Sequence, residues 1–249
     1  MLDYVLAGLD PHVFTALIAT SLIGSFIAVS VGIGGGVLVL TVMASILPPA
    51  ALIPVHGVIQ FGSNIFRAAL LARHTHWRPV VGFCIGSAIG AVVGGQLVIN
   101  LNPAVVQIAI GAFVIYSVVT NPPAWLTRFP VVTGGISSFL TMFFGATGVF
   151  VANFVKLLNL SRQSHVATHA TFMTAQHFLK TVVFGVLGFE FYPWIGFIAA
   201  MIVAGFLGTI LGRMVLIKLR DDRFKRALDI VLVFLAIRLI WMGLAQISG

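Results

Sequence analysis

Charged residues and cysteine are scarce in this chain of 249 residues. Only 8% of the residues are charged and 59% are hydrophobic, whereas a soluble domain carries about 25% charged residues. A normal water-facing surface cannot be built from so few charges, which excludes a soluble globular enzyme, a disordered chain and a coiled coil. The single cysteine, Cys84, excludes a disulfide framework and any multi-cysteine metal or iron–sulfur site.

Acidic residues are rarer than basic ones, and they avoid the middle of the hydrophobic segments. The chain has 6 Asp and Glu against 14 Lys and Arg, for a net charge of +8. Five acidic residues lie in termini or loops and the sixth begins the last segment; they are Asp3, Asp10, Glu190, Asp221, Asp222 and Asp229. A cation or metal site would need buried carboxylates, so cation transport is disfavoured. Much of the basic excess lies in short loops between apolar segments and predicts no nucleic-acid partner.

The sequence contains neither a nucleotide-binding motif nor a complete set of metal ligands. The chain has no GxxxxGK[ST] string, so transport driven by ATP on this chain alone is not expected. His165 and His169 have the i, i+4 spacing of a metal-binding pair, but no carboxylate or thiolate lies near them in the sequence. We therefore predict no bound metal and no cofactor.

Hydrophobic segments follow one another along the whole chain and predict an all-α integral membrane protein, because a crossing needs about 20 apolar residues. The ten segments cover residues 12–31, 36–48, 51–73, 79–99, 103–120, 130–144, 149–160, 163–187, 193–218 and 225–247. A helix of 12–15 residues reaches only about 18–22 Å, whereas the hydrocarbon core is about 30 Å thick. The first and second segments, and the sixth and seventh, can therefore form two hairpins that dip into the membrane.

The two halves of the chain carry a repeat. Residues 24–73 align without a gap on residues 137–186, at a constant offset of 113. We therefore expect a first membrane repeat over 1–120, a linker over 121–129 and a second repeat over 130–249. The uncommon residues that coincide are Gly32 with Gly145, Gly35 with Gly148, His56 with His169, and Arg67 with Lys180.

Basic residues in the loops predict that the two repeats are inverted relative to each other. The loop at 73–78 is basic, whereas its counterpart at 188–191 has no Lys or Arg. The loop at 100–102 is uncharged, whereas its counterpart at 218–226 is strongly basic. Basic loops favour the cytoplasm, so matching loops lie on opposite sides and both termini lie outside. Inverted repeats with broken helices that meet near the midplane are typical of transporters.

A stripe of polar residues occurs on one helical face in each repeat. A charge at mid-membrane costs about 2.5–3.5 kcal/mol on insertion scales, so such residues should face the protein interior. We expect them to bind a ligand; the alternatives are hydrogen bonds between helices or, for the two basic residues, snorkelling to the interface. The first stripe is His56, Gln60, Asn64 and Arg67. The second is His169, His177 and Lys180, with Met173 at the fourth matching position and Thr174 and Gln176 close by.

Glycine strings open the second and seventh segments and point to the same site. Gly34, Gly35 and Gly36 begin one short segment, and Thr147 and Gly148 begin the other. The N-terminus of a helix attracts anions, and glycine lets the backbone approach a ligand closely. Hinges or packing contacts are the alternative. The four-residue glycine stripes of residues 82–94 and 196–212 are expected to serve packing between helices.

These features together resemble the sulfite exporter TauE/SafE family. The resemblance rests on the string Gly32-Ile33-Gly34-Gly35-Gly36, the proline-broken short helix, the His56–Arg67 stripe and the degenerate second copy. It implies a carrier in the inner membrane that exports small sulfur-containing anions such as sulfite or organosulfonates. The partners are then the anion and the lipid bilayer.

The same sequence features also fit several other functions. An integral-membrane enzyme could use the three stripe histidines, although no nucleophile–base pair or buried carboxylate supports catalysis, so we expect no enzyme. An anion channel or a membrane subunit that scaffolds a partner would fit the same segments. Proton coupling would have to use His56, His169 or His177, since histidine titrates near neutral pH.

Overall fold

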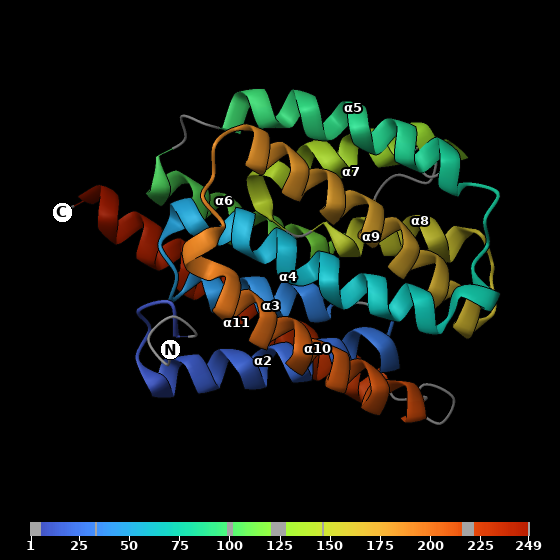
Figure 1. Cartoon of the computed structure of the whole chain (residues 1–249), viewed down its shortest axis with the longest axis horizontal. Coiled ribbons are helices and arrows are strands. Elements are labelled where there is room, and N and C mark those ends of the chain that lie inside the picture. The colour runs from blue at the N-terminus through green and yellow to red at the C-terminus, as the bar shows by residue number, and fades with distance from the viewer. Residues whose placement is uncertain are drawn as a thin grey trace.

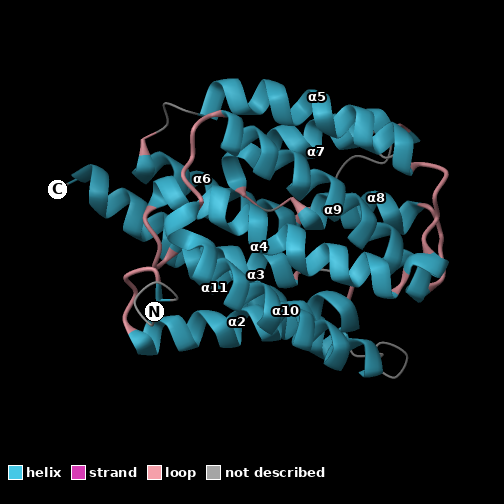
Figure 2. Cartoon of the chain, in the orientation of Figure 1, coloured by secondary structure: helices cyan, strands magenta, loops and turns pink. Residues whose placement is uncertain are grey.

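The computed structural model describes residues 6–32, 34–98, 102–120, 128–145, 147–215 and 222–248. Regular structure in these ranges is helical, without a strand (Figure 2). Each of the ten predicted segments coincides with one helix, to within a few residues at its ends. The helices are α2 (Pro11–Ser30), α3 (Gly35–Ala44), α4 (Pro49–Leu70), α5 (Val80–Val98), α6 (Pro103–Val119), α7 (Pro130–Phe144), α8 (Gly148–Leu157), α9 (Arg162–Val186), α10 (Ile195–Val215) and α11 (Asp222–Ser248).

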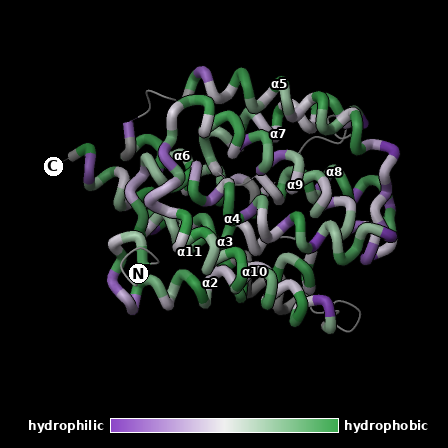
Figure 3. The backbone as a smooth tube through the Cα atoms, in the orientation of Figure 1, coloured by the Kyte–Doolittle hydropathy of each residue, from purple (hydrophilic) through white to green (hydrophobic). Residues whose placement is uncertain are grey.

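Three of these helices are long and apolar enough to cross a membrane over the described residues, namely Pro11–Ser30, Val80–Leu97 and Tyr192–Met214. Helices α3 and α8 have 10 residues each, which is about 15 Å of helix and half the thickness of the hydrocarbon core. Helices α4 and α9 are long, but they carry the polar stripes. Hydrophobic residues dominate the rest of the chain (Figure 3).

Helices of the N-terminal and C-terminal halves pack against each other in matched pairs. Helix α5 packs on α7, and α10 packs on α2. Between these two pairs, α4 packs against α9 in the middle of the bundle (Figure 1). Helix α6 packs on α11, which is a further contact between the N-terminal and C-terminal halves.

Glycines allow the helices of the two outer pairs, α5 with α7 and α10 with α2, to approach each other closely. A Cβ atom placed on Gly90 of α5 would lie 2.0 Å from the carbonyl oxygen of Gly135 on α7. A Cβ on Gly208 of α10 would lie 2.0 Å from the carbonyl oxygen of Leu22 on α2. Leu22 and Gly135 are 113 residues apart, which is the offset of the repeat, and they lie two residues before the aligned ranges. The predicted packing role of the glycine stripes is therefore confirmed, and side chains larger than hydrogen cannot fit there without moving a backbone.

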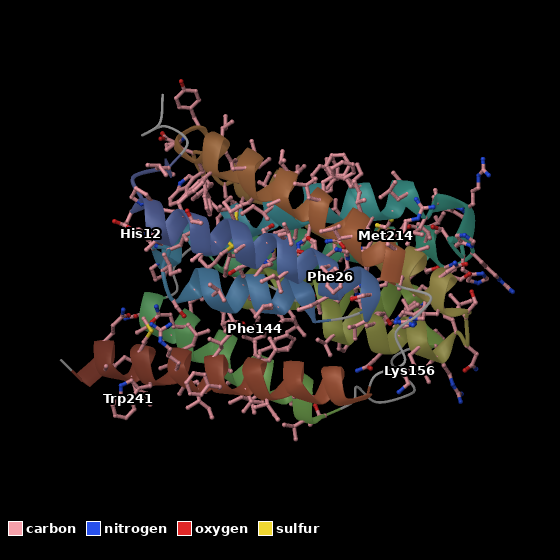
Figure 4. The ribbon with its side chains drawn as sticks, turned by 90° about the horizontal axis from the view of Figure 1, so that it is seen from below. His12, Phe26, Phe144, Lys156, Met214 and Trp241 are labelled. Atoms are coloured by element: carbon pink, nitrogen blue, oxygen red, sulfur yellow. The ribbon has the colours of Figure 1, made fainter. Side chains whose placement is uncertain are left out.

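The loop between α4 and α5 is fixed to α9 at one end of the bundle. The Thr75 hydroxyl lies 3.3 Å from that of Thr171, and the His76 backbone N–H donates to Thr168 Oγ1 at 2.9 Å. Side chains tipped with nitrogen gather at this end, which also carries Lys156, whereas His12 lies at the other end (Figure 4). Much of the basic charge thus lies at one end of the long helices.

Candidate functional site

Each short helix follows an interruption of helical structure, or break, and lacks a side-chain cap. The first break ends at Gly34 and the second at Thr147. Gly34, just before α3, has a φ of 93°, a left-handed conformation that glycine adopts without strain. Thr147 precedes α8, but its hydroxyl donates to the Ser137 carbonyl oxygen at 3.1 Å instead of capping the helix. The first-turn amides of a helix have no partner within the helix. Both breaks therefore present N–H donors that have no partner within the helix.

A cavity of about 30 Å³ lies where these breaks meet α4 and α9. That volume holds about two water-sized groups. Ten of the predicted site residues line it: Gly34, Gly35, Gly36, His56, Gln60, Asn64, Arg67, Gly148, His169 and His177. Residues far apart in sequence are thus brought to one place, as the polar stripes predict.

Helix α4 supplies a chain of hydrogen bonds that ends at a guanidinium. Gln60 accepts from Asn64 Nδ2 through its backbone oxygen, at 2.8 Å, and Asn64 Oδ1 accepts from Arg67 Nη1 at 3.1 Å. Arg67 is only 3% exposed, so it does not snorkel to the interface. Its Nε atom is buried without a hydrogen-bond partner. The neutral amide orients the guanidinium without neutralising its charge.

One histidine from each stripe binds the backbone of a short helix. His56 Nε2 lies 3.1 Å from the Gly36 carbonyl oxygen, and His169 Nε2 lies 2.9 Å from that of Gly148. A carbonyl oxygen only accepts, so each Nε2 carries the proton and donates. The ring of His177 stands edge-on to that of His56, with centroids 5.9 Å apart. Arg67 supplies a fixed positive charge to the cavity wall, because a guanidinium stays protonated.

Gln176 and Lys180 lie behind the cavity and hold the second break in place. Gln176 Nε2 donates to Thr147 Oγ1 at 2.7 Å, and Lys180 Nζ donates to the Gly145 carbonyl oxygen at 2.9 Å. Lys180 is fully buried. Thr147, Gln176 and Lys180, although expected at the ligand, are therefore placed in a second layer that supports Gly148.

Thr174 lies outside the cavity. Its hydroxyl donates to the Ala170 carbonyl oxygen at 2.8 Å, within its own helix, and the residue lines a groove on another face of α9. Three apolar residues line the cavity instead without having been predicted to: Ala28, Val37 and Met173. Met173 occupies the place in the second stripe that Gln60 has in the first, which is the one signal in the sequence that could have found it.

The cavity is positively charged and holds no carboxylate. None of its lining residues is acidic. Across the described residues, no group of three or more His, Cys, Asp and Glu side chains could hold a metal ion. The donors are instead a guanidinium, amides and free helix N-termini, which together suit a small anion.

Comparison with known proteins agrees with this chemistry. The model of the family described as "Sulfite exporter TauE/SafE" matches residues 17–239, which is nearly the whole chain. No curated protein and no solved structure matches the chain. The apolar helices and the family identify a multi-pass membrane protein of a transporter family. The chain therefore belongs to the sulfite exporter TauE/SafE family.

Proposed function

We propose that this protein is a secondary transporter that exports small sulfur-containing anions, such as sulfite or an organosulfonate, across the inner membrane. The anion binds in the cavity between the two breaks, near the midplane. The protein uses no cofactor and catalyses no reaction. The substrate-binding residues are the ten that line the cavity, and Thr147, Gln176 and Lys180 keep the second break in position.

The observation that carries this proposal is the buried guanidinium of Arg67. It faces a cavity formed by two uncapped helix starts, and among the described residues its hydrogen-bond partner is the neutral side chain of Asn64. A buried charge without a counter-charge is costly. An anion in the cavity would supply that counter-charge and would also accept hydrogen bonds from the helix amides.

Alternating access is supported by the matched packing of the two halves. The carbonyl groups of Leu22 and Gly135, which are separated by the repeat offset of 113, pack closely against Gly208 of α10 and Gly90 of α5, respectively. Such pairing is what two inverted repeats, over 1–120 and 130–249 with a linker at 121–129, would produce. The cavity of about 30 Å³ has room for about two water-sized groups, which is small for the lumen of an open channel and favours a carrier.

An anion panel tests the proposal and its alternatives. The purified protein is heated with sulfite, an organosulfonate, thiosulfate, sulfate or a carboxylate, and its melting temperature is recorded. A ligand at 100 times its Kd stabilises the folded state by about 2.7 kcal/mol. Sulfur anions should raise the melting temperature, and the same anions should exchange in proteoliposomes at a saturable rate. Consumption of the anion would indicate an enzyme, and a rate without saturation would indicate a channel.

Inverted repeats also predict a defined sidedness for four loops. In a Cys84→Ser background, single cysteines at His74 and Asp221 should react with membrane-impermeant reagents only from the cytoplasm. Cysteines at Asn102 and Glu190 should react only from outside, with both termini external. Asp221 lies outside the described residues, whereas His74, Asn102 and Glu190 are exposed. Labelling of His74→Cys and Glu190→Cys from the same side would contradict the inversion.

A further inference from the structure

A second hollow in the molecule is an apolar groove that is open at the surface of the helix bundle. It is a groove of about 400 Å³ between α4, α5 and α9. Its residues are small along the floor and aromatic at the ends: Phe61, Ile65, Ala68, Ala69, Ala72, Trp77, Val80, Cys84, Thr171, Thr174, Ala175 and Phe178. From Phe61 to Ala72 the floor runs for about 16 Å of helix. The rings of Phe61 and Phe178, 5.5 Å apart, lie together at the end away from the α4–α5 loop.

The two threonine hydroxyls of the groove already have partners. Thr174 Oγ1 donates to the Ala170 carbonyl oxygen, and Thr171 Oγ1 donates to that of Ala167. The groove therefore offers an incoming molecule almost entirely apolar contact. Such a surface suits a hydrocarbon chain.

The other end of the groove has a basic rim. The loop over residues 71–79 contains Arg73, His74, His76 and Arg78 and no acidic residue. Arg73 and Arg78 are exposed, and Trp77, which precedes Arg78 in the chain and lines the groove, is 60% exposed. The Thr75 and His76 hydrogen bonds to α9 hold this loop at the groove. Tryptophan beside arginine is typical of the level of lipid headgroups.

We propose that the groove binds one acyl chain of an anionic phospholipid, with the lipid phosphate against Arg73 and Arg78. The apolar floor takes the chain, and the rim takes the headgroup charge. A second copy of the protein is a poorer occupant. A symmetric dimer across this groove would bring two basic loops together, because a two-fold interface pairs each surface with itself.

Bound lipid at this place would contact both helices of the anion cavity. Helix α4 carries Arg67 toward the cavity and Ala68 and Ala69 toward the groove. Helix α9 carries His177 toward the cavity and Phe178 toward the groove. An acyl chain in the groove would therefore pack against α4 and α9, the two helices whose other faces line the cavity.

Native mass spectrometry of the detergent-purified full chain tests this site. The probes are phosphatidylglycerol and phosphatidylcholine with identical acyl chains. We expect phosphatidylglycerol to be retained preferentially. The Arg73→Gln/Arg78→Gln variant should bind phosphatidylglycerol about 30-fold more weakly, since each basic residue near an anionic surface contributes roughly fivefold in affinity. Arg213→Gln, an exposed arginine on α10, is the matched control and should keep the preference.

Cys84 provides a second readout within the groove. Phosphatidylglycerol should slow its reaction with a lipid-soluble maleimide in the wild type and in Arg213→Gln, but not in Arg73→Gln/Arg78→Gln. Ala69→Trp, at an exposed position on the groove floor, should fill the groove and abolish retention of both lipids. Equal retention of the two lipids, or phosphatidylglycerol binding that survives both variants, would overturn the proposal. Dimers that form in membranes and disappear in Ala69→Trp would assign the groove to a second copy instead.

Discussion

Arg67→Ala is expected to abolish anion binding and transport while the protein still folds. The guanidinium is buried in the cavity wall, and removing one partner of a buried, hydrogen-bonded charge pair costs about 2–5 kcal/mol. Affinity should therefore fall by about 30-fold or more. The melting temperature without anion should change little, because the loss of an unpaired buried charge offsets the loss of the hydrogen bond to Asn64. Anion-induced thermal shifts and flux into proteoliposomes, measured on the same preparation, check this result.

Three further variants separate binding from support. Arg67→Lys should restore part of the affinity, because lysine keeps the charge but not the planar fork of donors. Lys180→Met should lower flux and thermal stability more than affinity, since Lys180 donates to the Gly145 carbonyl oxygen and does not line the cavity. Arg213→Ala, on the exposed face of α10, should resemble the wild type. Normal flux in Arg67→Ala would remove the guanidinium from the site and with it the main support for the proposed function.

Gly35→Ala is expected to destabilise the protein and Gly148→Ala to weaken anion binding alone, although the two glycines match in the repeat. A Cβ on Gly35 would lie 1.8 Å from the Gly24 carbonyl oxygen, so α2 and α3 would have to separate. Overpacking of this kind typically costs about 1–3 kcal/mol and can cost more. A Cβ on Gly148 meets nothing closer than His169 Nε2 at 3.7 Å. Its methyl group would be placed at the cavity wall without disturbing the fold.

Melting temperature and affinity distinguish the two outcomes. Gly35→Ala should lower the melting temperature and the yield, and the protein that survives should have lost the shape of the cavity. Gly148→Ala should melt like the wild type but bind the anion more weakly, and Gly148→Val should bind it more weakly still. If Gly148→Val keeps normal affinity, the second break serves packing alone, and the anion contacts only the first break and the polar stripes.

The sequence was sufficient to predict the helices and most of the cavity, because both depend on local patterns. Long apolar runs define the ten helices, and the i, i+4 spacing brings His56, Gln60 and Asn64 to one face. Thr174 was expected at the site, but it lies about 100° around the helix from Met173 and faces the groove. The closeness of Thr174 to the stripe residues in sequence therefore did not predict which face of α9 it occupies.

The repeat also predicted more symmetry than the site has. His56 binds the carbonyl of Gly36, whereas His169 binds that of Gly148, which aligns with Gly35 and not with Gly36. The match therefore slips by one residue at the start of the short helices. Arg67 and Lys180 align, yet one lines the cavity and the other holds the Gly145 carbonyl. Such differences depend on how far a long side chain extends and what it meets, which an alignment does not contain.

The positive charge of Arg67 makes the proposed carrier sensitive to membrane voltage in one half of its cycle. With a monovalent anion bound, the site is neutral and can change sides without electrical work. The empty site keeps its charge, and moving one charge through 100 mV changes the free energy by about 2.3 kcal/mol. Voltage that is negative inside therefore draws the empty site back toward the cytoplasm, where an exporter loads its anion. The resting potential of the cell would in this way drive the return step of export.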